Sequence, residues 1–284
     1  MSKGVRRLLI IVIVVVAVLV AADFGTAAAA EYQISKRMRT ELNLTSDPSV
    51  DIKGFPFITQ ALGGDYQDIS VQASGVPVGN TLRDLEVDAD LKNVRIPFSD
   101  VLSGNFSALT VDEVDGQVQI NASDLGRLIG IPDLTINPES LDFIQGFGVD
   151  EKNQQIQQQQ QAQGNNSTPM YTQAGIDLSG TINIAGASTH VDAYGLISIE
   201  GPDNDIVVQP TKLELSNTAI TGLIPDAIQD PILKQLTYTF HRNSLPLPFQ
   251  VTPVGVQVQG GNGGALIVQG VAKNISFGGS ANSQ

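Results

Sequence analysis

Apolar residues fill positions 8–22 without interruption, and three basic residues precede them: Lys3, Arg6 and Arg7. A basic segment followed by an apolar run is typical of an export signal. The run is shorter than the about 20 residues that a membrane-spanning helix needs, although Phe24 and the alanines at 27–30 extend it past Asp23. The pattern predicts that the chain is sent across a membrane.

The fate of this segment is open on sequence alone. The small residues at 28–30 precede Glu31 and fit a signal-peptidase site, while the extended apolar run fits a retained helix. We interpret residues 1–30 as an export signal or membrane anchor and prefer the anchor. Either way, the rest of the chain is expected in the cell envelope, in the periplasm or on the outer face of the cytoplasmic membrane.

Periodicity changes after the apolar run. Ile34, Met38 and Leu42 are spaced four apart, as on one face of a helix. We expect an amphipathic helix over residues 31–46 that continues the anchor helix outward. The Asp47-Pro48 pair ends it, because proline disfavours the helical conformation of the residue before it.

Beyond residue 47 the apolar positions alternate, as in half-buried strands. Two early runs show this, at residues 69–73 and 85–91, and changes of parity after Leu91 and Val111 predict bulges that curve the sheet. Five later runs continue the pattern: 176–184, 191–199, 206–215, 251–258 and 266–277. The glycine-rich residues 260–264 predict a hairpin turn between the last two.

Two helices are expected among the strands. One covers residues 123–129 with Ser123 as N-cap, and the other runs from about Pro225 to Phe240. The predicted fold is α+β and mostly β, with a long curved antiparallel sheet wrapped around one or two helices, preceded by the N-terminal hydrophobic helix.

The domain organisation follows from the same patterns. A polar, glutamine-rich stretch at 151–169 has too few apolar residues to pack, and we predict a disordered insertion there. Strands are expected on both sides of it, so we predict one domain over residues 47–277. Residues 278–284 form a short tail.

Composition excludes several functions. The net charge of −13 leaves no basic surface for nucleic-acid phosphates. The absence of cysteine excludes disulfides, thiolate metal sites and a lipid-modified cysteine. Membrane attachment must therefore come from the peptide itself.

No catalytic, metal or cofactor site is predicted. The chain has two histidines, and Ser188 and His190 are the nearest approach to a nucleophile beside a base. The alternating acidic residues at 84–90 suit a solvated strand face better than a metal cage. Phosphate-cradling glycine motifs are absent.

Several segments together resemble the LmeA-type phospholipid-binding family of actinobacteria, formerly a domain of unknown function. The similar segments are GFPFITQALGGDY at 54–66, ISVQASGV at 69–76, LRDL at 82–85, PFSDVL at 97–102, VDEVDG at 111–116 and LPLPF at 245–249. The resemblance covers about residues 22–277 and departs mainly in the glutamine-rich insertion. It implies an envelope protein that binds phospholipid and is similar to tubular lipid-binding proteins.

Patterning and resemblance lead to the same expected function. We expect non-catalytic phospholipid binding, with acyl chains in an apolar groove, in support of envelope lipid or glycolipid maintenance. Phospholipid and membrane are the expected partners, nucleic acid is not, and the sequence leaves protein partners open. A structural envelope scaffold is one alternative. An envelope glycolipid enzyme using Asp112 and Asp115 as acid and base is another.

Three phenylalanines are the candidate lipid-contacting residues. Phe55, Phe57 and Phe249 lie in proline-interrupted apolar segments, where proline blocks continuation of a sheet. Such segments suit the margin of a sheet, so we expect at least one of these residues at the lipid entrance. Ordinary core packing is the alternative for each.

Overall fold

A computed structural model describes residues 3–78, 82–145, 171–184, 186–215, 226–241 and 251–276. The predicted glutamine-rich insertion, the tail and the segment 245–249 lie outside these described residues.

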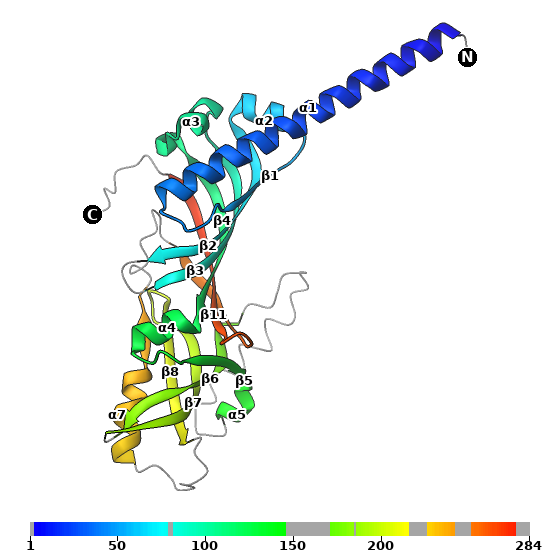
Figure 1. The fold of residues 1–284 in the computed structure, drawn as a ribbon. Coiled ribbons are helices and arrows are strands. Elements are labelled where there is room, and N and C mark those ends of the chain that lie inside the picture. Colours follow the sequence, from blue (N-terminus) through cyan, green and yellow to red (C-terminus); the bar gives the residue numbers. More distant parts are fainter. Residues whose placement is uncertain are drawn as a thin grey trace. The chain divides into compact units, whose positions relative to one another are not determined.

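The chain begins with one continuous helix, α1 (Lys3–Glu41), which joins the predicted anchor to the predicted amphipathic helix. No proline interrupts the sequence before Pro48, so the helix has no built-in break. By length and composition α1 is the one helix among the described residues that suffices to cross a membrane. Its N-terminal part projects free of the strands, and its later part lies beside β1, α2 and α3 (Figure 1).

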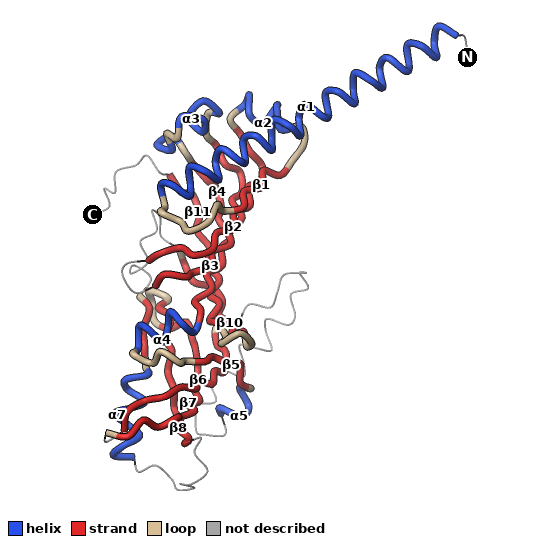
Figure 2. The backbone as a smooth tube through the Cα atoms, viewed as in Figure 1, coloured by secondary structure: helices blue, strands red, loops and turns tan. Residues whose placement is uncertain are grey.

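The remaining chain is mostly β and forms two antiparallel sheets, which confirms the predicted fold class. Figure 2 shows the strands in red. The first sheet has the order β1-β2-β3-β4-β11-β10, with β1 Ser49–Lys53, β2 Asp65–Val78, β3 Leu82–Arg95, β4 Thr110–Asn121, β11 Ala265–Ser276 and β10 Thr252–Gln259. The second has the order β5-β6-β7-β8-β9, with β5 Thr135–Glu139, β6 Gln173–Ile184, β7 Ala187–Glu200, β8 Asp205–Leu215 and β9 Tyr238–Phe240.

Within the described residues, five short helices connect the strands: α2 Phe57–Gly63, α3 Phe98–Ser103, the 3-10 helix η1 Phe106–Ala108, α4 Ala122–Ile129 and α5 Leu141–Gln145. A longer one, α7 (Asp226–Leu236), packs against β8. The sequence predicted α4 and α7 but none of the other four.

Several predicted details agree with the structure. The last two strands form the expected hairpin, with Gln259 opposite Ala265 across the glycine-rich turn. Asn93 adopts a left-handed φ of 52°, between Leu91 and Val94, where the apolar pattern was predicted to change parity. An asparagine tolerates this conformation better than most residues.

Two predicted boundaries were wrong. The N-cap position of α4 is Asn121, not Ser123, and the Asn121 side chain donates to the Asp84 carbonyl at 3.0 Å instead of capping the helix. The second helix ends at Leu236 and not at Phe240. Residues 238–240 form β9, because aromatic side chains favour strands and β8 offers an edge on which Phe240 pairs with Ile206.

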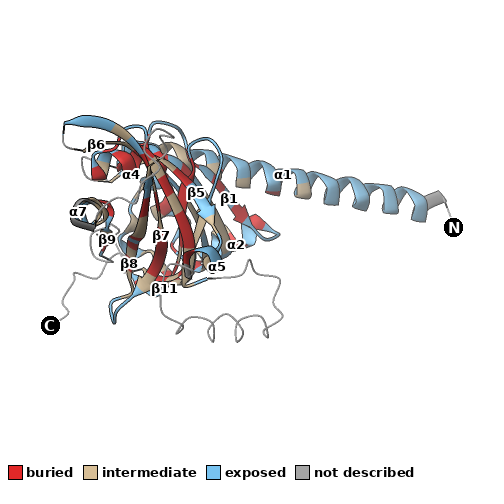
Figure 3. Cartoon of the chain, turned by 90° about the horizontal axis from the view of Figure 1, so that it is seen from below, coloured by how far each residue is buried: buried red, intermediate tan, exposed pale blue. Residues whose placement is uncertain are grey.

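The described fold divides into two compact units, one of residues 1–74, 88–115 and 272–284 and the other of residues 75–87 and 116–271. The division falls within four strands, β2, β3, β4 and β11. The second unit has a continuous core around the fully buried Ile136, Ile176 and Leu266. In Figure 3 buried residues follow the strands, whereas α1 is exposed along most of its length.

Candidate functional site

The first unit contains a groove of about 920 Å³ between α1, α2 and α3. This volume is near the upper end of the range of about 300 to 1,000 Å³ that is usual for small-molecule sites. Most of the lining is apolar: Ala29, Ala30, Phe57, Ile58, Ala61, Leu62, Ile96, Pro97, Phe98, Leu102 and Ala108. The polar side chains of the lining are Thr26, Gln33, Asp65, Arg95 and Ser99.

One face of α1 forms a wall of the groove. Thr26, Ala29, Ala30 and Gln33 follow the i, i+3, i+4, i+7 spacing of a helix face. The alanines leave room beside the helix, since they carry no side chain beyond Cβ. The Thr26 hydroxyl donates to the carbonyls of Ala22 at 3.0 Å and Asp23 at 2.9 Å, so its polar group is satisfied by its own helix.

A carboxylate on α1 holds the start of α2. Asp23 is only 4% exposed, and its two oxygens accept the backbone N–H groups of Phe57 and Ile58, each at 2.8 Å. The first N–H groups of a helix have no partner within the helix, so this side chain caps α2 from more than thirty positions away. Asp23 thereby fixes the second wall of the groove to the first.

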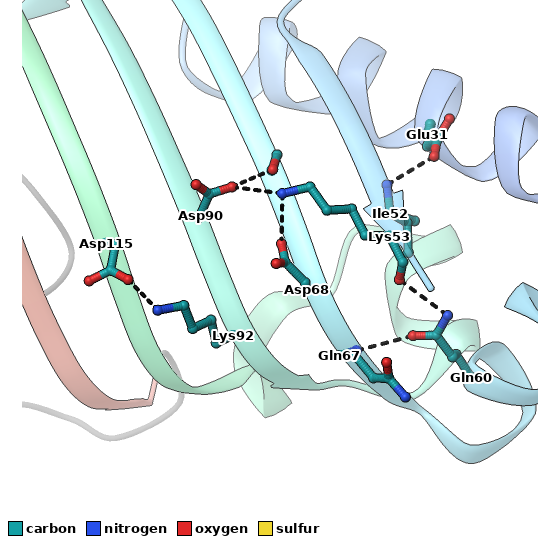
Figure 4. A network of polar contacts seen from close by, with 10 residues as sticks. Glu31, Ile52, Lys53, Gln60, Gln67, Asp68, Asp90, Lys92 and Asp115 are labelled. Carbon is teal, nitrogen blue, oxygen red and sulfur yellow. Dashed lines mark hydrogen bonds and ion pairs between the residues drawn. The ribbon is translucent and has the colours of Figure 1, made fainter. Parts of the chain in front are cut away.

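The other end of α2 is fixed to the sheet. Gly64 ends the helix with a φ of 70°, and its carbonyl accepts the Ile96 N–H at 2.8 Å. A Cβ at this position would lie 3.0 Å from the Ile96 carbonyl oxygen, so the close approach requires glycine. The Gln60 side chain donates to the Lys53 carbonyl at 3.3 Å and accepts the Gln67 N–H at 3.1 Å (Figure 4).

Aromatic rings form the floor of the groove. Phe57 is 2% exposed and lies 6.0 Å from Phe98 in an edge-to-face contact and 6.4 Å from Tyr66. Such contacts contribute about 0.5 to 1.5 kcal/mol beyond area burial. The floor of the groove is therefore apolar and packed against the core of the first unit.

The charged groups near the groove are paired with one another. Arg95 makes a bidentate contact with Asp112, at 2.8 and 2.9 Å, and its guanidinium holds the pKa of the Asp112 carboxyl below its usual range. Further along the same sheet, Lys53 lies between Asp68 and Asp90 at 3.2 and 3.1 Å, and Lys92 contacts Asp115 (Figure 4). Each of these cations is therefore engaged by carboxylates of the protein.

The two candidate phenylalanines that the structure describes lie in different environments. Phe57 lies on the groove floor, buried as in ordinary core packing. Phe55 is exposed, is not part of the lining, and stacks on Phe24 with ring centroids 6.0 Å apart. Phe249 lies outside the described residues. Whether any of the three contacts lipid stays a prediction.

A second polar cluster surrounds His190 on the paired strands β6 and β7. The Ser179 hydroxyl lies 3.0 Å from His190 Nε2 and donates to Asp192 at 2.6 Å, while Thr181 donates to Asp133 at 2.6 Å. In a catalytic triad the carboxylate orients the histidine and the serine donates to it. Here the serine hydroxyl donates its hydrogen bond to the carboxylate, so the arrangement is not that of a triad.

Metal chemistry has no support in the part of the chain that the structure describes, where no group of three or more potential ligands clusters. Sequence analysis missed the α1 wall and the role of Asp23. The signals were present, because small residues recur at helical spacing and one carboxylate interrupts an apolar helix.

These observations define the class of site: a largely apolar groove whose neighbouring cations are paired with carboxylates. A family model described as LmeA-like phospholipid-binding matches residues 21–269. The chain belongs to the LmeA-like phospholipid-binding family, which confirms the resemblance seen in its motifs. No curated protein and no solved structure matched the chain.

Proposed function

We propose that the protein binds phospholipid without catalysis in the cell envelope, with acyl chain in the groove between α1, α2 and α3. The observation that carries this proposal is the position of an apolar groove directly beside the apolar helix. Both walls of the groove belong to the matched segment of the family.

Acyl burial supplies enough free energy for this function. Each methylene removed from water contributes about 0.8 kcal/mol, so ten methylenes contribute roughly 8 kcal/mol before the costs of association. The groove therefore needs no dedicated cation for useful affinity, which agrees with the paired state of Arg95.

We further propose that α1 is retained as a membrane anchor on the outer face of the cytoplasmic membrane. Cleavage after Ala30 would remove Asp23, which caps α2, and the small residues of the groove wall. On the other side of that bond, the Glu31 carboxylate accepts the Ile52 N–H at 2.9 Å (Figure 4). A helix built into the domain on both sides of the cleavage position supports retention.

The pairing of Asp112 disfavours it as the general acid of the enzyme alternative. Asp112 is paired with Arg95 and its pKa is lowered, whereas a general acid needs a carboxyl whose pKa is raised. Asp115 is paired with Lys92. The scaffold alternative predicts instead that the groove carries no lipid.

The test compares two alanines that are neighbours on α1. Ala29→Phe places a ring in the groove, whereas Ala28→Phe places the same ring on an exposed position outside the lining. The full chain is purified in detergent, and the phospholipid it retains is quantified by mass spectrometry. Ala29→Phe should lower retention about tenfold, the effect of excluding about two methylenes.

Retention by Ala28→Phe should match the parent chain. Equal retention in both variants would place the lipid elsewhere, and absence of phospholipid from the parent chain would favour the scaffold alternative.

A further inference from the structure

We infer that four apolar side chains, one on α1 and three beside it, insert into the outer leaflet of the bilayer that α1 crosses. This apolar collar consists of Phe24, Phe55, Ile58 and Leu62. The inference rests on the retained anchor in the proposed function, but it does not require a lipid in the groove.

The collar is exposed to a degree that is costly in water. Phe24 is 62% exposed, Phe55 61% and Leu62 85%. Phe24 and Phe55 stack on each other, and Ile58 and Leu62 are one helical turn apart on α2. The Ile58 N–H donates to Asp23, the residue before Phe24, so the two pairs meet where α2 contacts α1. Contiguous exposed apolar side chains mark sites of contact with a protein or a membrane.

The length of the apolar run identifies the membrane as the partner. At about 1.5 Å per residue, positions 8–22 span about 22 Å, whereas the hydrocarbon core of a bilayer is about 30 Å thick. The collar begins two residues after this run, at Phe24. It therefore supplies apolar surface at the depth where the helix alone falls short.

Between residues 8 and 30, α1 carries one charged side chain, Asp23, and it is hidden from lipid. Asp23 is 4% exposed, and both of its oxygens accept N–H groups from α2. An ionisable side chain at a membrane interior normally faces protein in this way. From residue 24 to residue 30, α1 carries no further charged residue.

Insertion of the collar places the rim of the groove among acyl chains. Ile58 and Leu62 belong both to the collar and to the groove lining. A phospholipid can then pass from the leaflet into the groove without exposing its acyl chains to water. The collar is thus the entrance to the groove as well as a docking surface.

The test uses the absence of tryptophan from the chain. Phe55→Trp places a single tryptophan in the collar, at a position that does not line the groove. The full chain is reconstituted into vesicles of phosphatidylcholine and phosphatidylglycerol that carry bromine on their acyl chains. Bromine quenches a tryptophan that lies in the hydrocarbon region, so Phe55→Trp should lose most of its emission.

Leu42→Trp is the matched control. Leu42 is an exposed leucine directly after the end of α1, about 27 Å from Phe24 along the helix axis at about 1.5 Å per residue. Its tryptophan should keep its emission in the same vesicles. Equal emission from both variants, with or without bromine, would overturn the inference.

A third chain, Phe55→Trp with Ala29→Phe, separates docking from groove occupancy. Quenching that persists when the groove is filled supports insertion of the collar. Quenching lost in this chain would show that the bromine was on a groove-bound lipid, which overturns docking but leaves the proposed lipid binding intact. Quenching of Phe55→Trp in a chain with the native Ala29 that retains no phospholipid would support docking and overturn the proposed lipid binding.

Discussion

Asp177 shows how one side chain makes the second unit sensitive to pH. It lies on β6, opposite Asn137 on β5 and Tyr194 on β7. Burial, together with the nearby carboxylates of Asp192 and Glu139, raises the pKa of its carboxyl to about 6. The folded protein therefore holds this proton more firmly than the unfolded chain does.

The sign of the pH effect follows from linkage. The stabilisation from protonated Asp177 is complete below the unfolded pKa of about 4 and is lost as the pH rises through about 6. We predict that Asp177→Asn raises the free energy of unfolding at pH 7.5. A shift of two units corresponds to about 3 kcal/mol, which we reduce to about 1 kcal/mol for partial solvent screening.

Urea unfolding followed by circular dichroism at pH 7.5 and pH 5 measures the effect, which should shrink at the lower pH. Asp133→Asn is the control of opposite sign, because hydrogen bonds from Thr181 lower the pKa of Asp133. A gain from Asp177→Asn that is equal at both pH values would contradict the titration and indicate a packing effect.

At the scale of elements, local periodicity was a good guide to strands and a poor guide to short helices. The strands β6, β7, β8, β10 and β11 lie within four residues of their predicted bounds, because alternation is visible over a whole strand. By contrast, α2 and α3 have seven and six residues, too few for a helical period to show.

The candidate site was predictable in kind but not in position. Sequence patterns indicated an apolar groove near the segment at residues 54–57, and Phe57 lies on its floor. The opposite wall comes from α1, which the sequence suggested as an anchor alone. Its part in the groove depends on the long-range contacts of Asp23, which no local pattern contains.

The segment between α5 and β6 gives a prediction at the same scale. Deleting residues 154–166 should leave stability and phospholipid retention nearly unchanged, since this polar stretch buries little apolar surface and closure entropy grows slowly with loop length. Thermal unfolding and lipid mass spectrometry of the deleted chain check this. A large loss of folded protein would show that the stretch is structural.

At the scale of the whole molecule, the two compact units share four strands. Each of these strands begins in one unit and ends in the other, so the two units are joined by continuous strands and not by linkers. We predict that residues 47–277 unfold in one cooperative transition. Calorimetry of the chain lacking residues 154–166 tests this, and two transitions with different midpoints would indicate two domains.

The unbroken course of α1 limits how an anchored molecule can work. The helix enters the domain with no intervening linker, and Asp23 binds the start of α2. The groove is therefore not connected to the N-terminal part of α1 by a flexible segment. The distance between the groove and the apolar run of α1 is set by the helix and not by the length of a linker. If α1 is retained as the proposed anchor, we expect that the protein does not carry lipid across the envelope by itself and that the acceptor of the lipid comes to the bilayer.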